Sequence, residues 1–189
     1  MNQNQLHKTG SIVGLLLISA VLSIAFLDQL NHHDLPCPLC LLQRISFVAM
    51  GICLCMNLKI GIKTSHYGLM LLAAGLGFGE ALRQVFLHLI PGAPGYGHLF
   101  WGLELYIWSL IAFAIAIALI AIGLLFEKGF TDVPRKVGCG AHVLMFFFHT
   151  LILLNVISTF IECGLLVCKD NPTGYYLLQS RTLNNTTQE

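Results

Sequence analysis

Five long apolar segments, separated by short polar stretches, make up most of the chain. A helix needs roughly 20 mostly apolar residues to cross the hydrocarbon core of a bilayer, and each segment is about that long. The pattern therefore predicts five membrane-spanning helices, at about residues 11–30, 39–58, 67–90, 103–126 and 141–162. The prolines and glycines of residues 91–97 cannot continue a helix and predict a turn between the third and fourth spans.

The composition supports a membrane protein. Of the 189 residues, 56% are hydrophobic and only 10% are charged, whereas a soluble domain of this length would be far more polar. Five spans leave little chain for a separate soluble domain, so we expect one compact bundle in the lipid bilayer. The first segment follows Lys8 and could pass for a signal peptide, but no convincing small-residue cleavage site follows it, so we expect it to be retained.

The basic residues predict an orientation. The net charge of +1 and the scattered lysines and arginines give no reason to expect a nucleic-acid partner. Cytoplasmic loops of membrane proteins are enriched in lysine and arginine. With a cytoplasmic N-terminus, the inner segments carry six such residues: Lys8, Lys59, Lys63, Lys128, Arg135 and Lys136. The outer segments carry only Lys169 and Arg181, with Arg44 near the outer face, and five spans place the C-terminal tail outside.

A Cys-x-x-Cys motif, Cys37-Pro-Leu-Cys40, lies at the predicted outer end of the second span. If the helix begins near Pro38, the unpaired N–H groups of its first turn and the helix dipole stabilise a thiolate at Cys40. Arg44 lies one turn later on the same face and is always charged, so it can stabilise that thiolate or polarise an oxygen of an electron acceptor.

Other interpretations of the motif remain open. The two cysteines could be small buried residues or form a structural disulfide without turnover. A metal site would need two further ligands, for which His32 and His33 are the nearby candidates. We expect no metal. A thioredoxin-type soluble domain is excluded because the chain lacks a βαβ pattern.

The motif Cys37-Pro-Leu-Cys40 with Arg44 resembles that of the disulfide bond formation protein B (DsbB) family of bacterial inner-membrane oxidoreductases. Ala81-Leu-Arg83 resembles the family's third helix, and residues 100–104 with Trp108 resemble the entry to its fourth. The resemblance covers about residues 10–127. It implies an all-α membrane protein with a four-helix core in residues 1–136, to which residues 137–189 add a fifth helix and a periplasmic tail.

The resemblance also implies an activity. Cys37 and Cys40 would pass electrons from the thiols of a DsbA-like periplasmic oxidase to ubiquinone or menaquinone, with Cys40 facing the quinone and Arg44 beside its ring. Chemistry alone agrees that an acceptor is needed, because making a disulfide releases two electrons that must pass to a bound cofactor.

The chain departs from the family in its second cysteine pair. DsbB proteins normally hold that pair in the loop between the third and fourth spans, and residues 91–102 contain no cysteine. Cys163 and Cys168 instead follow the fifth span, on the same predicted side as Cys37. We hypothesise that they relay electrons from the partner's thiols to Cys37. A local structural disulfide, or two unpaired thiols at a helix end, is the alternative.

Further polar residues in the third span are weaker candidates. Glu80 and Arg83 lie three residues apart, where an ionised group in lipid is costly, so we expect either a mutual ion pair or a contact of Arg83 with the cofactor site. His88 could neighbour the quinone or donate a proton, although a histidine at the membrane interface needs no such role. Gly75, Gly77 and Gly79 predict a small-residue face for close helix packing.

Two other functions are compatible with the sequence. A vitamin K epoxide reductase-like protein shares the membrane bundle, the Cys-x-x-Cys motif and a quinone, but carries the motif late in its bundle. A non-catalytic membrane subunit, or a heme or metal chaperone, could use the cysteines to bind a ligand. We expect Cys53 and Cys55 to be small core residues and Cys139 to remain reduced near the cytosol.

Overall fold

The computed structural model describes residues 3–32, 35–89, 99–125 and 137–164, together with Cys168 and Tyr175. These residues form five long helices: α1 (Gln3–His32), α2 (Pro38–Lys59), α3 (Thr64–His88), α4 (Leu105–Leu125) and α5 (Cys139–Cys163). Each is long and apolar enough to cross a membrane. The predicted all-α, multi-pass membrane fold is therefore confirmed. The main difference lies in α1, which begins well before residue 11 because the helix continues through the polar residues that precede the apolar run.

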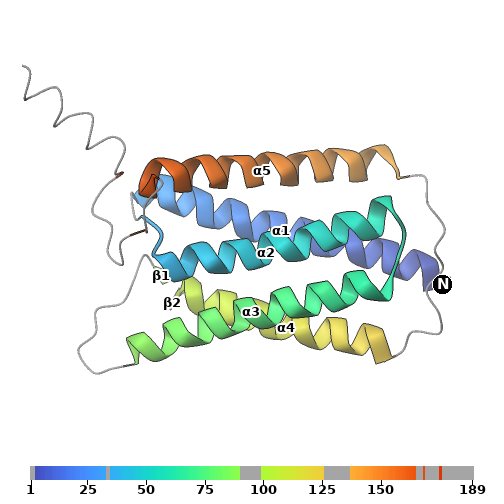
Figure 1. Cartoon of the computed structure of the whole chain (residues 1–189), viewed down its shortest axis with the longest axis horizontal. Coiled ribbons are helices and arrows are strands. Elements are labelled where there is room, and N and C mark those ends of the chain that lie inside the picture. The colour runs from blue at the N-terminus through green and yellow to red at the C-terminus, as the bar shows by residue number, and fades with distance from the viewer. Residues whose placement is uncertain are drawn as a thin grey trace, which may run out of the picture.

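The helices run antiparallel along one axis (Figure 1). Helix α2 packs between α1 and α3, and α4 packs on α3, which gives the four-helix core. Helix α5 packs on α1 and α2, on the side away from α3 and α4 (Figure 1). The appended helix therefore covers one face of the core.

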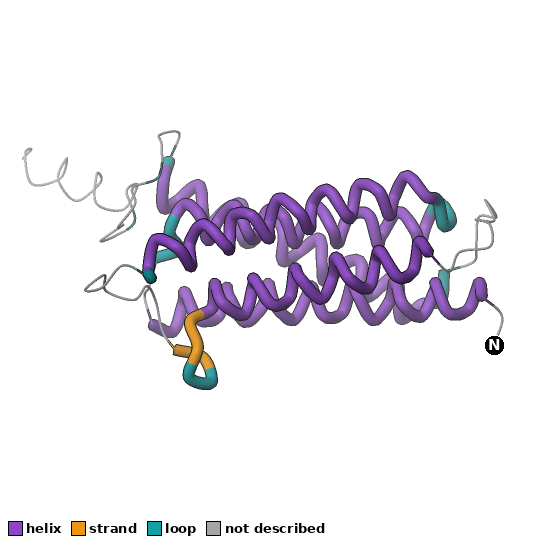
Figure 2. The backbone as a smooth tube through the Cα atoms, turned by 90° about the horizontal axis from the view of Figure 1, so that it is seen from below, coloured by secondary structure: helices purple, strands orange, loops and turns teal. Residues whose placement is uncertain are grey.

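A short hairpin precedes α4. Strands β1 (Leu99–Phe100) and β2 (Leu103–Glu104) pair antiparallel, and Trp101 and Gly102 form the turn between them (Figure 2). Both turn residues have a positive φ, as in the type I′ turns that suit two-residue hairpin loops. The apolar pattern predicts residues 103–104 as part of the fourth helix. That boundary was wrong because two-residue strands are too short to show an alternating pattern.

The core is closed by two aromatic rings that lie directly over glycines. Phe113 of α4 is fully buried, stacks on Phe47 and covers Gly77 of α3. Phe148 of α5 is also fully buried and covers Gly51 of α2. These glycines allow α4 and α5 to approach their neighbours closely.

Of the predicted glycine face, only Gly77 contributes to this packing. A Cβ atom at Gly75 or Gly79 would meet nothing within 4 Å, whereas one at Gly77 would overlap the ring of Phe113. Residues two apart lie on nearly opposite sides of a helix, so the three glycines cannot share one interface.

We expect Gly77→Ala to destabilise the protein by about 1–3 kcal/mol, because the added methyl group overpacks a closed core. The denaturant-induced unfolding of the purified protein in detergent measures the effect. Gly75→Ala is the matched control on the same helix and should unfold like the parent. Equal stability of the Gly77 and Gly75 variants would contradict the close packing.

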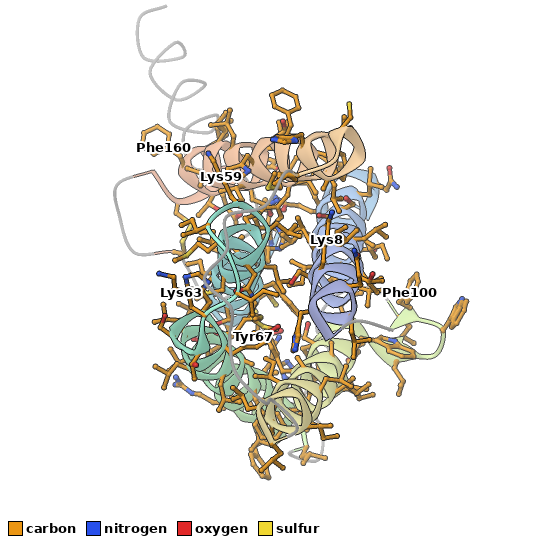
Figure 3. All side chains as sticks on the ribbon, turned by 90° about the vertical axis from the view of Figure 1, so that its right-hand side faces the viewer. Lys8, Lys59, Lys63, Tyr67, Phe100 and Phe160 are labelled. Carbon is orange, nitrogen blue, oxygen red and sulfur yellow. A yellow bond between two sulfur atoms is a disulfide. The ribbon has the colours of Figure 1, made fainter. Side chains whose placement is uncertain are left out.

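Basic residues gather at one end of the bundle. Lys8, Lys59 and Lys63 lie together at the end that faces the viewer in Figure 3, whereas Cys37 begins α2 at the opposite end. This separation agrees with the predicted orientation, which stays a prediction. Apart from Arg44, the other basic residues used for it lie outside the described residues: Lys128, Arg135, Lys136, Lys169 and Arg181.

Candidate redox site

The Cys-x-x-Cys motif forms the beginning of α2. Cys37 is the N-cap residue, and its Sγ accepts a hydrogen bond from the backbone N–H of Cys40 at 3.2 Å. Pro38 follows in the first turn, where its missing N–H leaves no helical hydrogen bond unmade. The predicted helix start is confirmed, and Cys40 lies in the first turn, where the helix end favours negative charge.

The two sulfurs lie 2.7 Å apart, as a pair of free thiols. Closing a disulfide would bring them to about 2 Å, so the backbone already holds the pair close to bonding distance. Cys37 is buried and Cys40 is partly exposed. The pKa of the Cys37 thiol is raised well above its ordinary value, first by its hydrogen bond with Cys40 and second by burial. Cys37 therefore keeps its proton, while Cys40 is the partly exposed residue of the pair.

Gln84 of α3 contacts both sulfurs, a role that the sequence analysis did not predict. Its Nε2 donates to Cys37 Sγ at 3.4 Å and to Cys40 Sγ at 3.3 Å. Its Oε1 accepts from Gln43 Nε2 at 2.7 Å and, at 3.7 Å, from the Cys40 thiol. Gln84 is only 1% exposed. The sequence does show a glutamine within a membrane span, which indicates a polar contact. Its partner could be identified only once α2 and α3 were known to be neighbours.

Arg44 is held by acceptors from two other helices. Its Nη1 donates to Gln29 Oε1 of α1 at 2.9 Å and to Asn155 Oδ1 of α5 at 3.2 Å. Its Nη2 donates to the carbonyl oxygen of Ala25 at 2.9 Å. These contacts fix the guanidinium within the bundle, at the level of the cysteine pair.

Cys40 and Arg44 line the same cavity, as their spacing on one helix face predicted. The cavity lies between α1, α2 and α4 at the Cys37 end of the bundle. Its other polar lining residues are Asp28, Gln29, Gln43, Tyr106 and Ser109, and the remaining walls are largely apolar. The main packing partners of α1 are α2 and α5, whereas that of α4 is α3, so the cavity is flanked by two helices that are not close neighbours.

The structure places His88 next to this cavity and Arg83 away from it. The ring of His88 stacks on that of Tyr106, with centroids 5.1 Å apart, and its Nδ1 donates to the backbone oxygen of Gln84 at 2.8 Å. Arg83 is exposed on α3 and does not line the cavity. Glu80 accepts from Ser46 Oγ at 3.3 Å and forms no ion pair with Arg83 in this part of the chain. The role of Arg83 in binding a cofactor stays a prediction, and its position outside the cavity lining does not support it.

Cys163 and Cys168 form a disulfide at the C-terminal end of α5. This end of α5 lies at the same end of the bundle as the start of α2 (Figure 1), as the predicted topology requires. Cys163 is buried and Cys168 is partly exposed. The two cysteines are thus paired, and whether the pair carries electrons stays a prediction.

Cys53 and Cys55 are buried in α2, as expected for small core residues. Cys139 is exposed at the start of α5, and its location near the cytosol stays a prediction. No group of three potential metal-ligating side chains lies together within the described ranges. His33 and the side chain of His32 lie outside those ranges.

Comparison with known proteins gives a consistent result for the first half of the chain. The sequence model of the family "Disulfide bond formation protein DsbB" matches residues 7–95, a range that includes the cysteine pair, Arg44 and Gln84. The predicted resemblance extended to residue 127, so its part around residues 100–108 lies beyond the match.

Curated relatives named "Disulfide bond formation protein B" cover the same region. The chain is 36% identical over 88 residues to the protein of Xylella fastidiosa strain 9a5c, an alignment that covers 42% of this chain and 49% of the relative. It is 35% identical over 96 residues to the protein of Chromobacterium violaceum, an alignment that covers 48% of this chain and 57% of the relative. The chain spans about half the length of the curated relatives it matches. No solved structure matches it. Over residues 7–95, which hold the cysteine pair and Arg44, this multi-pass membrane protein is similar in sequence to the DsbB family.

Proposed function

We propose that the protein is a thiol:quinone oxidoreductase that reoxidises a DsbA-like periplasmic dithiol oxidase and passes the electrons to ubiquinone or menaquinone. It would act in a bacterial inner membrane, with its N-terminus in the cytoplasm and its C-terminus in the periplasm. The observation that carries the proposal is that a free cysteine, Cys40, and a fixed cation, Arg44, line one cavity near the end of a membrane bundle.

The cavity residues suit a quinone ring. Val21, Leu22 and Phe47 offer apolar contacts for the ring, as binding sites for such cofactors require. Three of the five guanidinium N–H groups of Arg44 are used by the acceptors described above, which leaves two without a hydrogen-bond partner among the described residues. These N–H groups can donate to a carbonyl oxygen of the ring.

A bound quinone would supply the acceptor for two electrons and two protons. The chain's own residues do the rest. Cys37 holds its proton and hydrogen-bonds to Cys40, which faces the cavity. Gln84 and Arg44 stabilise negative charge on the Cys40 sulfur as its proton leaves. Formation of the Cys37–Cys40 disulfide then releases two electrons and two protons, and a partner's dithiol reduces it again by thiol–disulfide exchange.

Quinone-dependent oxidation of a dithiol protein tests the proposal directly. The purified chain in detergent is mixed with a reduced thioredoxin-fold protein and either a short-chain ubiquinone or a short-chain menaquinone, and the quinone absorbance is followed. We expect one quinone to be consumed for each disulfide formed. Binding of heme or metal without turnover would favour a non-catalytic subunit. Dithiol-dependent reduction of vitamin K epoxide would favour the vitamin K epoxide reductase-like alternative.

Gln84→Leu is expected to lower the turnover about tenfold, because losing a hydrogen bond to a charged sulfur costs about 1.5 kcal/mol. Turnover at saturating quinone and the rate of Cys40 alkylation should fall together. Ser46→Ala, which removes a polar contact on the next turn of the α2–α3 interface, is the control. A Gln84→Leu variant with parental turnover would remove Gln84 from the site.

A further inference from the structure

Helix α5 carries a polar face that points toward the α1–α2 pair. Asn155, Ser158 and Glu162 follow each other at helical spacing, three and four residues apart, in a helix that is otherwise mostly apolar. Asn155 and Glu162 are buried. Polar side chains within a membrane span are costly and generally serve a specific contact. The family match ends at residue 95, so it says nothing about this face.

Asn155 is oriented toward Arg44 by its own helix. Its Nδ2 donates to the carbonyl oxygen of Leu151 at 2.9 Å, which fixes the amide so that Oδ1 faces the other way. That Oδ1 accepts from Arg44 Nη1 at 3.2 Å. The contact joins residues 111 positions apart in the sequence, so only the packing of α5 on α2 creates it.

A second contact from α5 supports the same guanidinium indirectly. Ser158 Oγ accepts from Gln29 Nε2 at 2.9 Å. This bond turns the amide of Gln29 so that its Oε1 accepts from Arg44. Two of the three acceptors around Arg44 are therefore supplied or oriented by α5. Glu162, on the same face, also interacts electrostatically with Arg44, and neither of its oxygens has a hydrogen-bond partner in the described ranges.

We propose that Asn155 is a positioning residue for Arg44, so that the fifth helix completes the quinone-facing half of the site. This inference rests on the proposed function. The role is separate from that of the Cys163–Cys168 pair, because it acts through the guanidinium and not through thiol exchange. Removing the acceptor would let the guanidinium shift away from the cavity, which weakens quinone binding and leaves the dithiol half-reaction intact.

The test compares Asn155→Leu with Asn155→Asp in the full chain. Leucine has a similar volume but no acceptor, whereas aspartate keeps an acceptor oxygen toward Arg44. With a short-chain ubiquinone and dithiothreitol, we expect Asn155→Leu to raise the KM for quinone about tenfold while the KM for the dithiol stays at the parental value. Asn155→Asp should restore the KM for quinone. Thr150→Val, which removes a hydroxyl bonded only to its own helix on the exposed face of α5, is the matched control.

The outcomes separate positioning from simple helix anchoring. A lower thermal stability with an unchanged KM for quinone would show that Asn155 only holds α5 in place, and would overturn the inference. If Asn155→Leu does not fold, Asn155→Ala replaces it, and the same difference from Asn155→Asp is expected. A parental protein that oxidises no dithiol with quinone would contradict the proposed function and this inference with it. An active parent with an unaffected Asn155→Leu variant would contradict this inference alone.

Discussion

Cys40→Ser is expected to lower quinone-dependent dithiol oxidation by more than roughly a thousandfold, to the background rate, because a serine oxygen can neither form a disulfide nor pass on electrons. Cys40 is the partly exposed member of the pair and the one that lines the cavity, so no other sulfur in the described residues can take its place. The rate of quinone absorbance loss at saturating dithiol measures the effect.

Cys53→Ser is the matched control for this loss, since Cys53 lies on the same helix in the core and should leave turnover near the parental rate. The Cys40→Ser variant also leaves Cys37 without its partner thiol, so Cys37 should form a lasting mixed disulfide when the partner protein is supplied in its disulfide form. Quinone consumption that continues in the Cys40→Ser variant would contradict the proposed mechanism.

The Cys163→Ser/Cys168→Ser variant is expected to oxidise a protein dithiol on the order of a hundredfold more slowly, because the partner loses its positioned point of entry. Oxidation of dithiothreitol should stay near the parental rate, since a small dithiol can reduce the Cys37–Cys40 disulfide without a relay. The comparison of the two substrates in one assay separates a relay from a general loss of activity.

A structural disulfide gives a different result. If the pair only holds the end of α5, the double variant should oxidise the protein dithiol at the parental rate and should unfold at a lower temperature. That outcome would leave Cys37 and Cys40 as the direct partners of the substrate thiols.

The helices of this protein could be predicted from local patterns. Each membrane span can be recognised from its length and hydropathy. The start of α2 at Cys37 and Pro38 follows from the residue preferences of helix N-termini. The shared face of Cys40 and Arg44 follows from helical spacing alone, and the cavity confirms it. In each case the information lies within one helical segment.

The residues around the site could not be predicted in the same way. Gln84 lies 44 positions from Cys40, and Asn155 lies 111 positions from Arg44, so their roles depend on which helices are neighbours. The predicted site residue of this helix was instead Arg83, which is adjacent to Gln84 but lies on the exposed side of α3. Arg83 was predicted because it is charged. The observed contacts with the cysteine pair and Arg44 come from neutral amides, which cost less free energy to bury in a membrane than a charge does.

The position of the cavity between α1 and α4 bears on how an oxidant would be supplied. These helices pack mainly on other partners, so a quinone in the proposed site could enter between them from the hydrocarbon layer. The quinone ring could enter the cavity laterally from the bilayer, while its isoprenoid tail stays among the acyl chains. Turnover in vesicles would then follow the mole fraction of the oxidant in the bilayer and would be insensitive to its tail length.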